Sequence, residues 1–152
     1  MKAHVNEMCS PPRVNSMIER LGMIPGMSLD LTTNDPEDNM PWDFNKEDKR
    51  NKAEAMVKAK SSLLLVVSPM CAAFSRLQRL NFPKMDPKTV KEIIDHGVKH
   101  LEFCMHLCKL QHDEGLYFLY EHPASARSWN RLVQGLMQLP EVHCVTCNMC
   151  MF

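Results

Sequence analysis

The sequence is poor in glycine and has no excess charge of either sign and no long hydrophobic run. Its five glycines are too far apart to form a GxGxxG or GxxxxGK loop, so no phosphate-binding loop of that kind is encoded. Lys and Arg together number 18, as do Asp and Glu, which excludes a polybasic, histone-like protein. The densest apolar stretch, Leu63–Val67, is far shorter than the roughly 20 residues of a membrane-spanning helix.

The cysteines and the N-terminal residues favour a reduced protein. Seven cysteines are an odd number, and MKAHVNEMCSPP lacks the apolar run of a secretory signal, so a disulfide-stapled secreted fold is not expected. We therefore expect an intracellular protein, nuclear or cytoplasmic. With 152 residues, 45% hydrophobic and 24% charged, the chain can bury one core, and we expect a single domain over residues 1–152.

Strand-like and helix-like segments alternate along the chain. Strands are expected over 3–8, 27–32, 62–67, 116–120 and 142–146, and helices over 11–21, 46–60, 87–112 and 126–139. The apolar runs SLLLVV and LYFLY are typical of strands that are covered on both faces. Because helix-length connections join parallel strands, the pattern predicts an α/β fold, a three-layer Rossmann-like, mostly parallel sheet with helices on both faces.

Two other segments have a distinct character. Residues 33–45 combine prolines with acidic side chains and predict an irregular surface loop anchored by Trp42 and Phe44. Residues 68–86 are expected to be a second loop, and the basic side chains of the helix over 46–60 to form a solvated face. A cysteine-rich end, 144–152, closes the chain.

Several polar side chains follow the expected strands directly. Because ligands of an open parallel sheet bind outside the carboxyl ends of its strands, these residues are the candidates for a functional site. They lie in four loops: Cys9–Pro12 after the first strand, Asp30 with Thr32 and Thr33 at the second, Ser68–Cys71 after the third, and Glu121–Pro123 after the fourth.

Cys71 and Glu121 are the candidates for chemistry. A thiol beside a helix N-terminus has a lowered pKa and a larger thiolate fraction, whereas a cysteine in a core is a small, inert hydrophobe. Glu121 follows four apolar residues, where a carboxylate needs either a functional role or a partner in a cap or ion pair. The residues alone do not decide whether Cys71 is a reactive thiol or a core residue. They also do not decide whether Glu121 has a functional role or only a structural partner.

Two strings around these residues resemble a known enzyme family. LLLVVSPMCAAFS resembles motif IV of the cytosine-C5 DNA methyltransferases, and LYFLYEHP resembles their motif VI, in the same order and with similar spacing. The resemblance implies that Cys71 attacks C6 of an extruded cytosine and that Glu121 engages N3, so that C5 takes a methyl group from S-adenosylmethionine. The implied partner is DNA.

The resemblance extends to the cofactor side. It implies that Asp30 is the ribose-binding acid and Asp43, in PWDF, the acid at the adenine, with Ser10 and Ser68 in the loops beside the cofactor. The family's later arginine motif and target-recognition region would have to come from a second chain or from a C-terminal region beyond Phe152.

Three departures from the family leave other functions open. Ser10–Arg13, with two prolines, stands where the family has a glycine-rich loop, Met70 separates Pro69 from Cys71, and His122 follows Glu121 where the family has Asn. A degenerate, inactive methyltransferase-like domain or fragment fits these departures. So does a non-catalytic interaction domain, since SPMCxxFS and EHPxxxxSW are similar to segments of mobile-element polyproteins.

A zinc-stabilised binding module is a further alternative. Its ligands would be Cys144, Cys147 and Cys150 with one residue of the helix over 87–112, which carries His96, His100, Cys104, Cys108 and His112. Core packing of these cysteines is the competing interpretation. The sequence therefore assigns no residue to a metal.

Overall fold

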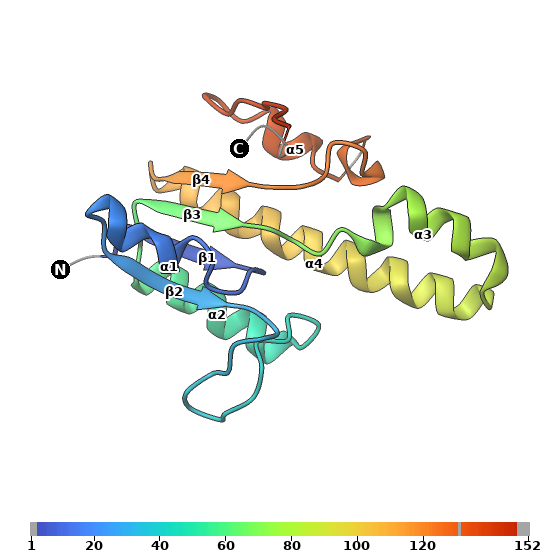
Figure 1. Cartoon of the computed structure of the whole chain (residues 1–152), viewed down its shortest axis with the longest axis horizontal. Coiled ribbons are helices and arrows are strands. Elements are labelled where there is room, and N and C mark those ends of the chain that lie inside the picture. Colours follow the sequence, from blue (N-terminus) through green and yellow to red (C-terminus); the bar gives the residue numbers. More distant parts are fainter. Residues whose placement is uncertain (1–2, 131, 149–152) are drawn as a thin grey trace.

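The fold is built on a small, all-parallel sheet of four strands. The computed structural model describes residues 3–130 and 132–148. The strands are β1 (Val5–Met8), β2 (Pro25–Leu29), β3 (Leu64–Val67) and β4 (Tyr117–Tyr120), in the order β2-β1-β3-β4 (Figure 1). The predicted α/β, Rossmann-like fold is confirmed. The strand order reverses between β1 and β3, which is where open α/β sheets bind their ligands.

Two long helices cover one face of the sheet. They are α2 (Glu47–Ala59) and α4 (Pro87–Asp113), which confirm the two helices expected there. The Asp86 carboxylate caps α4 by accepting from the amides of Lys88 and Thr89, and Gly115, at a φ of 69°, follows its end. In Figure 1, α4 passes behind the sheet and continues beyond its carboxyl edge, where α3 (Arg76–Asn81) folds back beside it.

The main core lies between this face and the two long helices. Its fully buried members include Met8, Leu65, Val67, Val57 and Leu107. The loop over 33–45 closes one side of the core, with Trp42 and Phe44 each 1% exposed, so the predicted anchoring by these two aromatics is confirmed. Lys49 of α2 is only 3% exposed, because it pairs with buried Asp35 at 2.7 Å, and the expectation that every basic residue there is solvated is wrong.

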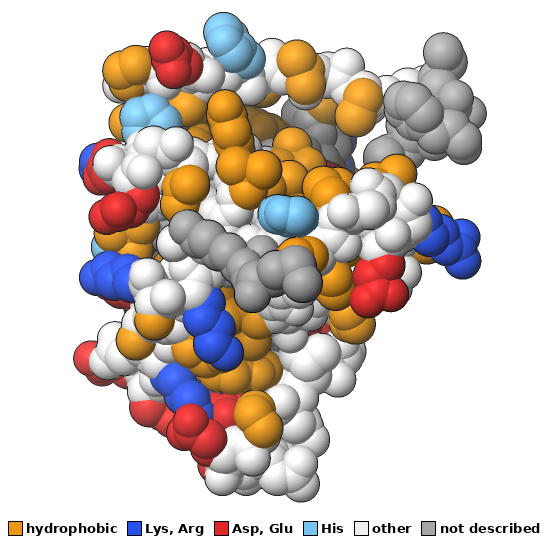
Figure 2. All heavy atoms as spheres, turned by 90° about the vertical axis from the view of Figure 1, so that its left-hand side faces the viewer, with side chains coloured by type: hydrophobic (Ala, Val, Ile, Leu, Met, Phe, Trp, Pro, Cys, Tyr) orange, Lys and Arg blue, Asp and Glu red, His pale blue; other side chains and the backbone are white. Residues whose placement is uncertain are grey.

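The opposite face of the sheet is covered only in part. It carries the one-turn helix α1 (Asn15–Ile18), whose Ile18 packs on Val5 and Val66. On β4, Tyr117 is 68% and Leu119 is 53% exposed, so the prediction of a strand buried on both faces is wrong: β4 is an edge strand with one open face. Figure 2, viewed toward the amino ends of the strands, also shows exposed hydrophobic side chains between charged ones.

Several helices are shorter than the ranges that the sequence predicts. The helix over 11–21 is reduced to α1 and the 3-10 helix η1 (Glu19–Leu21), and the one over 126–139 to η4 (Arg127–Asn130) and α5 (Gln134–Met137). The strand expected over 142–146 does not form, because the chain there does not pair with the sheet. The expected loop over 68–86 contains α3, η2 (Ala72–Phe74) and η3 (Phe82–Lys84).

One glycine sets the start of β2. A Cβ on Gly26 would lie 2.1 Å from the Asn6 Oδ1 atom and 2.5 Å from the Val5 carbonyl oxygen, so no larger residue permits this approach of β2 to β1. β2 therefore begins at Pro25, earlier than the alternation from Met27 indicates. No helix among the described residues is long and apolar enough to cross a membrane.

Candidate functional site

Three loops leave the sheet side by side at its carboxyl edge. They are the β1 loop (residues 9–14), the β3 loop (68–75) and the β4 loop (121–126). The strand ends are level, since Met8 pairs with Val67 and Val67 with Tyr120. The ladder continues into the loops, because the Ser68 amide donates to Met8 at 3.1 Å and the Glu121 amide to Val67 at 2.9 Å.

The β3 and β4 loops follow strands that pair with each other, and His122 lies at the start of the β4 loop. His122 is buried and its Nε2 atom lies 2.7 Å from the Ser128 hydroxyl. Burial lowers the pKa of this imidazole, and the neighbouring Pro69 backbone acts in the opposite direction. The two loops that carry Cys71 and Glu121 therefore begin side by side, after the paired residues Val67 and Tyr120.

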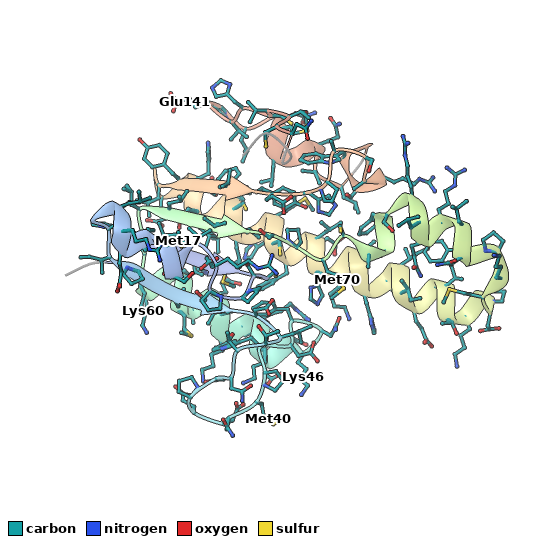
Figure 3. All side chains as sticks on the ribbon, viewed as in Figure 1. Met17, Met40, Lys46, Lys60, Met70 and Glu141 are labelled. Atoms are coloured by element: carbon teal, nitrogen blue, oxygen red, sulfur yellow. The ribbon has the colours of Figure 1, made fainter. Side chains whose placement is uncertain are left out.

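The two candidate reactive residues differ in environment. Cys71 is half-buried directly before η2, and its carbonyl accepts from the Phe74 amide at 3.0 Å. Glu121 is exposed as the first residue after β4. Neighbouring Met70, labelled in Figure 3, is 53% exposed where the chain leaves β3 toward α3. Both candidates lie at the edge that the sequence predicts, and Cys71 remains accessible to a ligand.

Gly97 of α4 supports the β3 loop. A Cβ at this position would lie 2.6 Å from the Ala73 Cβ atom and 3.1 Å from the Phe74 ring. The loop therefore packs directly on the backbone of α4 at Ala73 and Phe74, two and three residues beyond Cys71. The sequence analysis did not assign a role to this glycine.

Glu7 organises the β1 loop. The side chain is fully buried, and its carboxylate accepts from the Val14 amide at 2.9 Å, the Asn15 amide at 2.8 Å and the Ser28 hydroxyl at 3.2 Å. The first amides of a helix carry partial positive charge and commonly bind an anion. In this protein the chain's own carboxylate takes that position.

The β1 loop does not fit the carboxylate of S-adenosylmethionine. In Rossmann-like folds the free amides of this loop and of the following helix receive such an anion. Pro11 and Pro12 have no N–H, the Arg13 amide donates to Pro11, and the next two amides donate to Glu7. Ser10 is buried and its hydroxyl donates to the Pro11 carbonyl at 2.9 Å. The amides of Arg13, Val14 and Asn15 are therefore already used, and Pro11 and Pro12 supply none.

The other residues expected beside the cofactor stabilise local turns. The Asp30 carboxylate accepts from the amide and the hydroxyl of Thr32, at 2.9 and 2.7 Å. The Asp43 carboxylate accepts from the Asn45 amide at 3.0 Å. Ser68 is half-buried at the start of the β3 loop. Asp30 and Ser68 lie at the carboxyl edge, whereas Asp43 belongs to the loop over 33–45.

A thiol cluster that the sequence analysis did not single out lies under the β1 loop. The Cys9 and Cys104 sulfurs are 3.4 Å apart, and Cys9 has a φ of 58°, an uncommon value for a residue other than glycine. The hydrogen bond from Cys104 lowers the pKa of Cys9 to about 7 against the effect of burial, and His100 contributes to the lowering. Two features of the sequence could have indicated this thiol cluster: Cys9 directly follows a strand, and Cys104 lies on the apolar stripe of α4.

The zinc alternative has no support from residues 3–130 and 132–148, which hold no group of three or more His, Cys, Asp and Glu side chains that could bind a metal. Cys144 and Cys147 are exposed thiols, and Cys150 lies outside the described residues. Cys104 and Cys108 are fully buried in the core, as the competing interpretation expects.

The chain was compared with protein-family models, with curated proteins and with solved structures, and none of them matches it. Its function therefore has to be argued from the residues at the carboxyl edge of the sheet.

Proposed function

We propose that this chain is a cytosine-C5-methyltransferase-like domain that binds a nucleobase of DNA where the β3 and β4 loops meet. The observation that carries the proposal is the placement of Cys71 and Glu121 in loops that follow adjacent, level parallel strands. A thiol and a carboxyl group at one edge are the pair that addition to a cytosine ring requires.

The chemistry proposed for this pair is reversible addition. The Cys71 thiolate bonds to C6 of an extruded cytosine while Glu121 donates a proton to N3, and the electrons of the C5–C6 double bond move to C5. C5 then takes a proton from water. Loss of the original C5 proton to water, return of the N3 proton to Glu121 and expulsion of the Cys71 thiolate regenerate the base, with its C5 hydrogen exchanged for one from solvent.

A basic arm beside Cys71 supports DNA as the partner. The β3 loop leads into α3 and the start of α4, which extend beyond the sheet in Figure 1. Four exposed basic side chains lie along this segment: Arg76, Arg79, Lys84 and Lys88. Lys and Arg side chains on an accessible element bind the phosphate backbone and make the affinity dependent on salt. The arm would hold a DNA strand next to the carboxyl edge of the sheet, where Cys71 and Glu121 lie.

Methyl transfer is not part of the proposal, because the β1 loop does not fit the cofactor's carboxylate. Calorimetric titration with S-adenosylmethionine tests this, with Asp30→Ala as the control for binding at the carboxyl edge. We expect no binding at millimolar cofactor. Micromolar binding that is lost in Asp30→Ala would show that the loop does admit the cofactor. Methyl transfer would then become part of the proposed function.

Hydrogen exchange at C5 tests the base chemistry. DNA that carries tritium at cytosine C5 is incubated with the wild-type chain, Cys71→Ala, Glu121→Gln and the matched control Cys147→Ala. We expect tritium release by the wild type and the control, background release by Cys71→Ala, and release lowered about 100-fold by Glu121→Gln. Equal release by Cys71→Ala and the wild type would contradict the assignment of the nucleophile.

A non-catalytic interaction domain is the second candidate, and the open face of β4 favours it. Tyr117 and Leu119, two positions apart on β4, are both exposed on this face. Aromatic and aliphatic side chains that gather on a surface are typical of interaction sites. DNA binding without any tritium release would support this function over base chemistry.

A further inference from the structure

Cys9 and Cys104 meet at the boundary between the β1 loop and the core. Cys9 is half-buried and directly follows β1, whereas Cys104 is fully buried on the face of α4 that packs against the sheet. Their sulfur atoms are 3.4 Å apart although the residues are 95 positions apart in the chain. A disulfide bond of about 2.05 Å requires the two sulfurs to approach by only about 1.4 Å.

We propose that Cys9 and Cys104 form a redox-active pair, in which Cys9 reacts with a hydroperoxide and Cys104 resolves the product as a disulfide bond. This proposal does not depend on the function proposed for the β3 and β4 loops. It assigns a modification site to Cys9, which the methyltransferase resemblance does not use, and to Cys104, which the core-packing interpretation treats as an inert core residue.

The reaction has two balanced steps. The Cys9 thiolate attacks the outer oxygen of ROOH, the O–O bond breaks, and Cys9 sulfenic acid forms as RO⁻ takes up a proton to leave as the alcohol. The Cys104 thiol then loses its proton and attacks the Cys9 sulfur. The S–O bond breaks, water leaves, and the two cysteines have been oxidised by two electrons while the hydroperoxide has been reduced to alcohol and water.

The surroundings assign different roles to the two thiols. The two thiols share a hydrogen bond, and the pKa of Cys9 is lowered by this bond and by His100, which favours the thiolate of Cys9. The pKa of Cys104 is raised by the same hydrogen bond and by burial. Cys9 also retains some exposure, whereas Cys104 has none. The attacking thiol must be ionised and reachable, and the resolving thiol must be adjacent.

Two nearby cysteines serve as internal controls. Cys108 lies one turn further along α4 in the same core, and burial raises its pKa. Cys71 lies at the same edge of the sheet after the neighbouring strand and is half-buried like Cys9. The proposed pair is therefore specific to the sulfur contact and not a property of every cysteine in the region.

Peptide mapping of the oxidised full chain tests the proposal. The reduced wild-type protein is treated with an equimolar amount of hydrogen peroxide, alkylated with N-ethylmaleimide and digested without reductant for mass spectrometry. We expect a peptide pair joined through Cys9 and Cys104 that dithiothreitol separates, and a melting temperature several degrees higher in the oxidised form, because the bond closes a long loop. Recovery of Cys9 and Cys104 as alkylated thiols, or of Cys9 joined to another cysteine, would overturn the pair.

Variants separate the two roles. In Cys104→Ala we expect Cys9 to stop at the sulfenic acid, which dimedone labels, and in Cys108→Ala we expect the joined peptides to form as in the wild type. Loss of the joined peptides in folded Cys108→Ala, shown by an unchanged circular dichroism spectrum, would refute the assignment of Cys104 as the resolving thiol. If Cys104→Ala does not fold, the wild-type peptide map still decides the question.

Discussion

The β1 and β3 loops leave neighbouring strands at the same edge of the sheet, yet they differ in how they are held. Buried Glu7 binds two amides at the start of α1 and so fixes the β1 loop from inside, and Cys9 contacts α4 through Cys104. In the part of the chain that the structure describes, no carboxylate holds the β3 loop in this way. It packs on α4 at Gly97 and then continues into the exposed arm with α3.

This difference shows that position after a strand does not by itself determine what a cysteine can do. Cys9 and Cys71 both follow inner strands, and both are half-buried. Only Cys9 has a second thiol and an imidazole beside it among the described residues, which gives it redox chemistry. Cys71 remains at an accessible edge, which suits it to a ligand from outside.

The largest expected effect comes from removing the carboxylate that holds the β1 loop. Glu7→Ala leaves two amides and the Ser28 hydroxyl without their buried acceptor, so we expect the free energy of unfolding to fall by about 3–5 kcal/mol. Urea denaturation measures it. Cys71→Ala, a half-buried change in the β3 loop, should cost less than about 1 kcal/mol. Equal losses in the two variants would remove the contrast between the loops.

The next largest effect is expected where the β3 loop packs on α4. In Gly97→Ala the new Cβ would overlap the Ala73 Cβ atom, and overpacking of this kind costs about 1–3 kcal/mol, partly offset by the better helix propensity of alanine. We expect Cys71 to be alkylated faster by iodoacetamide in the native protein, with no change at Cys9. Mass spectrometry of time points gives both rates.

Gly135 provides the matched control, since an added Cβ there meets nothing within 4 Å. Gly135→Ala should therefore leave both alkylation rates unchanged. An increase at Cys9 as large as that at Cys71 in Gly97→Ala would indicate that α4 supports the two loops as one unit.

A smaller effect concerns the ionisation of Cys9. Its pKa of about 7 predicts that its alkylation rate rises with pH through a midpoint near neutrality. Cys104→Ala removes the hydrogen bond that contributes most to the lowering, so the midpoint should move to higher pH. The pH profile of iodoacetamide labelling in the two proteins checks this. An unmoved midpoint would show that Cys104 does not donate to Cys9.

The smallest effect is expected outside both loops. Hydrogen bonds from Lys49 and then Lys52 hold the pKa of Asp35 well below its usual range. A carboxyl group with a lowered pKa in the folded state contributes stability above its unfolded pKa, about 3.9, and loses it as the pH falls below that value. Melting temperatures from pH 6 to pH 2 should therefore fall less steeply in Asp35→Asn than in the wild type, with Cys9 labelling unchanged.

The regular elements could be predicted where one pattern governed them. The apolar periodicity of α4 continues over 27 residues and its ends carry Asp86, Pro87 and Gly115, so its bounds agree with the prediction nearly to the residue. The helix over 126–139 has a similar apolar pattern but breaks into η4 and α5. Helical spacing therefore predicted a continuous helix only where capping residues and length supported it.

For the site, the sequence predicted the position of Cys71 and Glu121 but not the interior of the β1 loop. Glu7 looked like one residue of a weak strand, and nothing local indicates that it accepts from α1 and β2 at once. Cys104 looked like a core residue, which it is, but its contact with Cys9 depends on where α4 packs against the sheet relative to the end of β1. Such contacts join residues far apart in the chain and leave no periodic signal.

The sequence by itself therefore determined the order of strands and helices, the parallel α/β class and the set of residues that follow the strands. Periodicity, capping residues and strand length depend on residues that are close together in the sequence. They can therefore be predicted without knowledge of the tertiary structure. Only the tertiary structure decided that Glu7 closes the β1 loop to an anion, that β4 keeps an open face, and that Cys9 lies 3.4 Å from Cys104. The physical reason is that hydrogen bonds, burial and thiol contacts depend on which elements pack together, and this packing is fixed by the whole core at once.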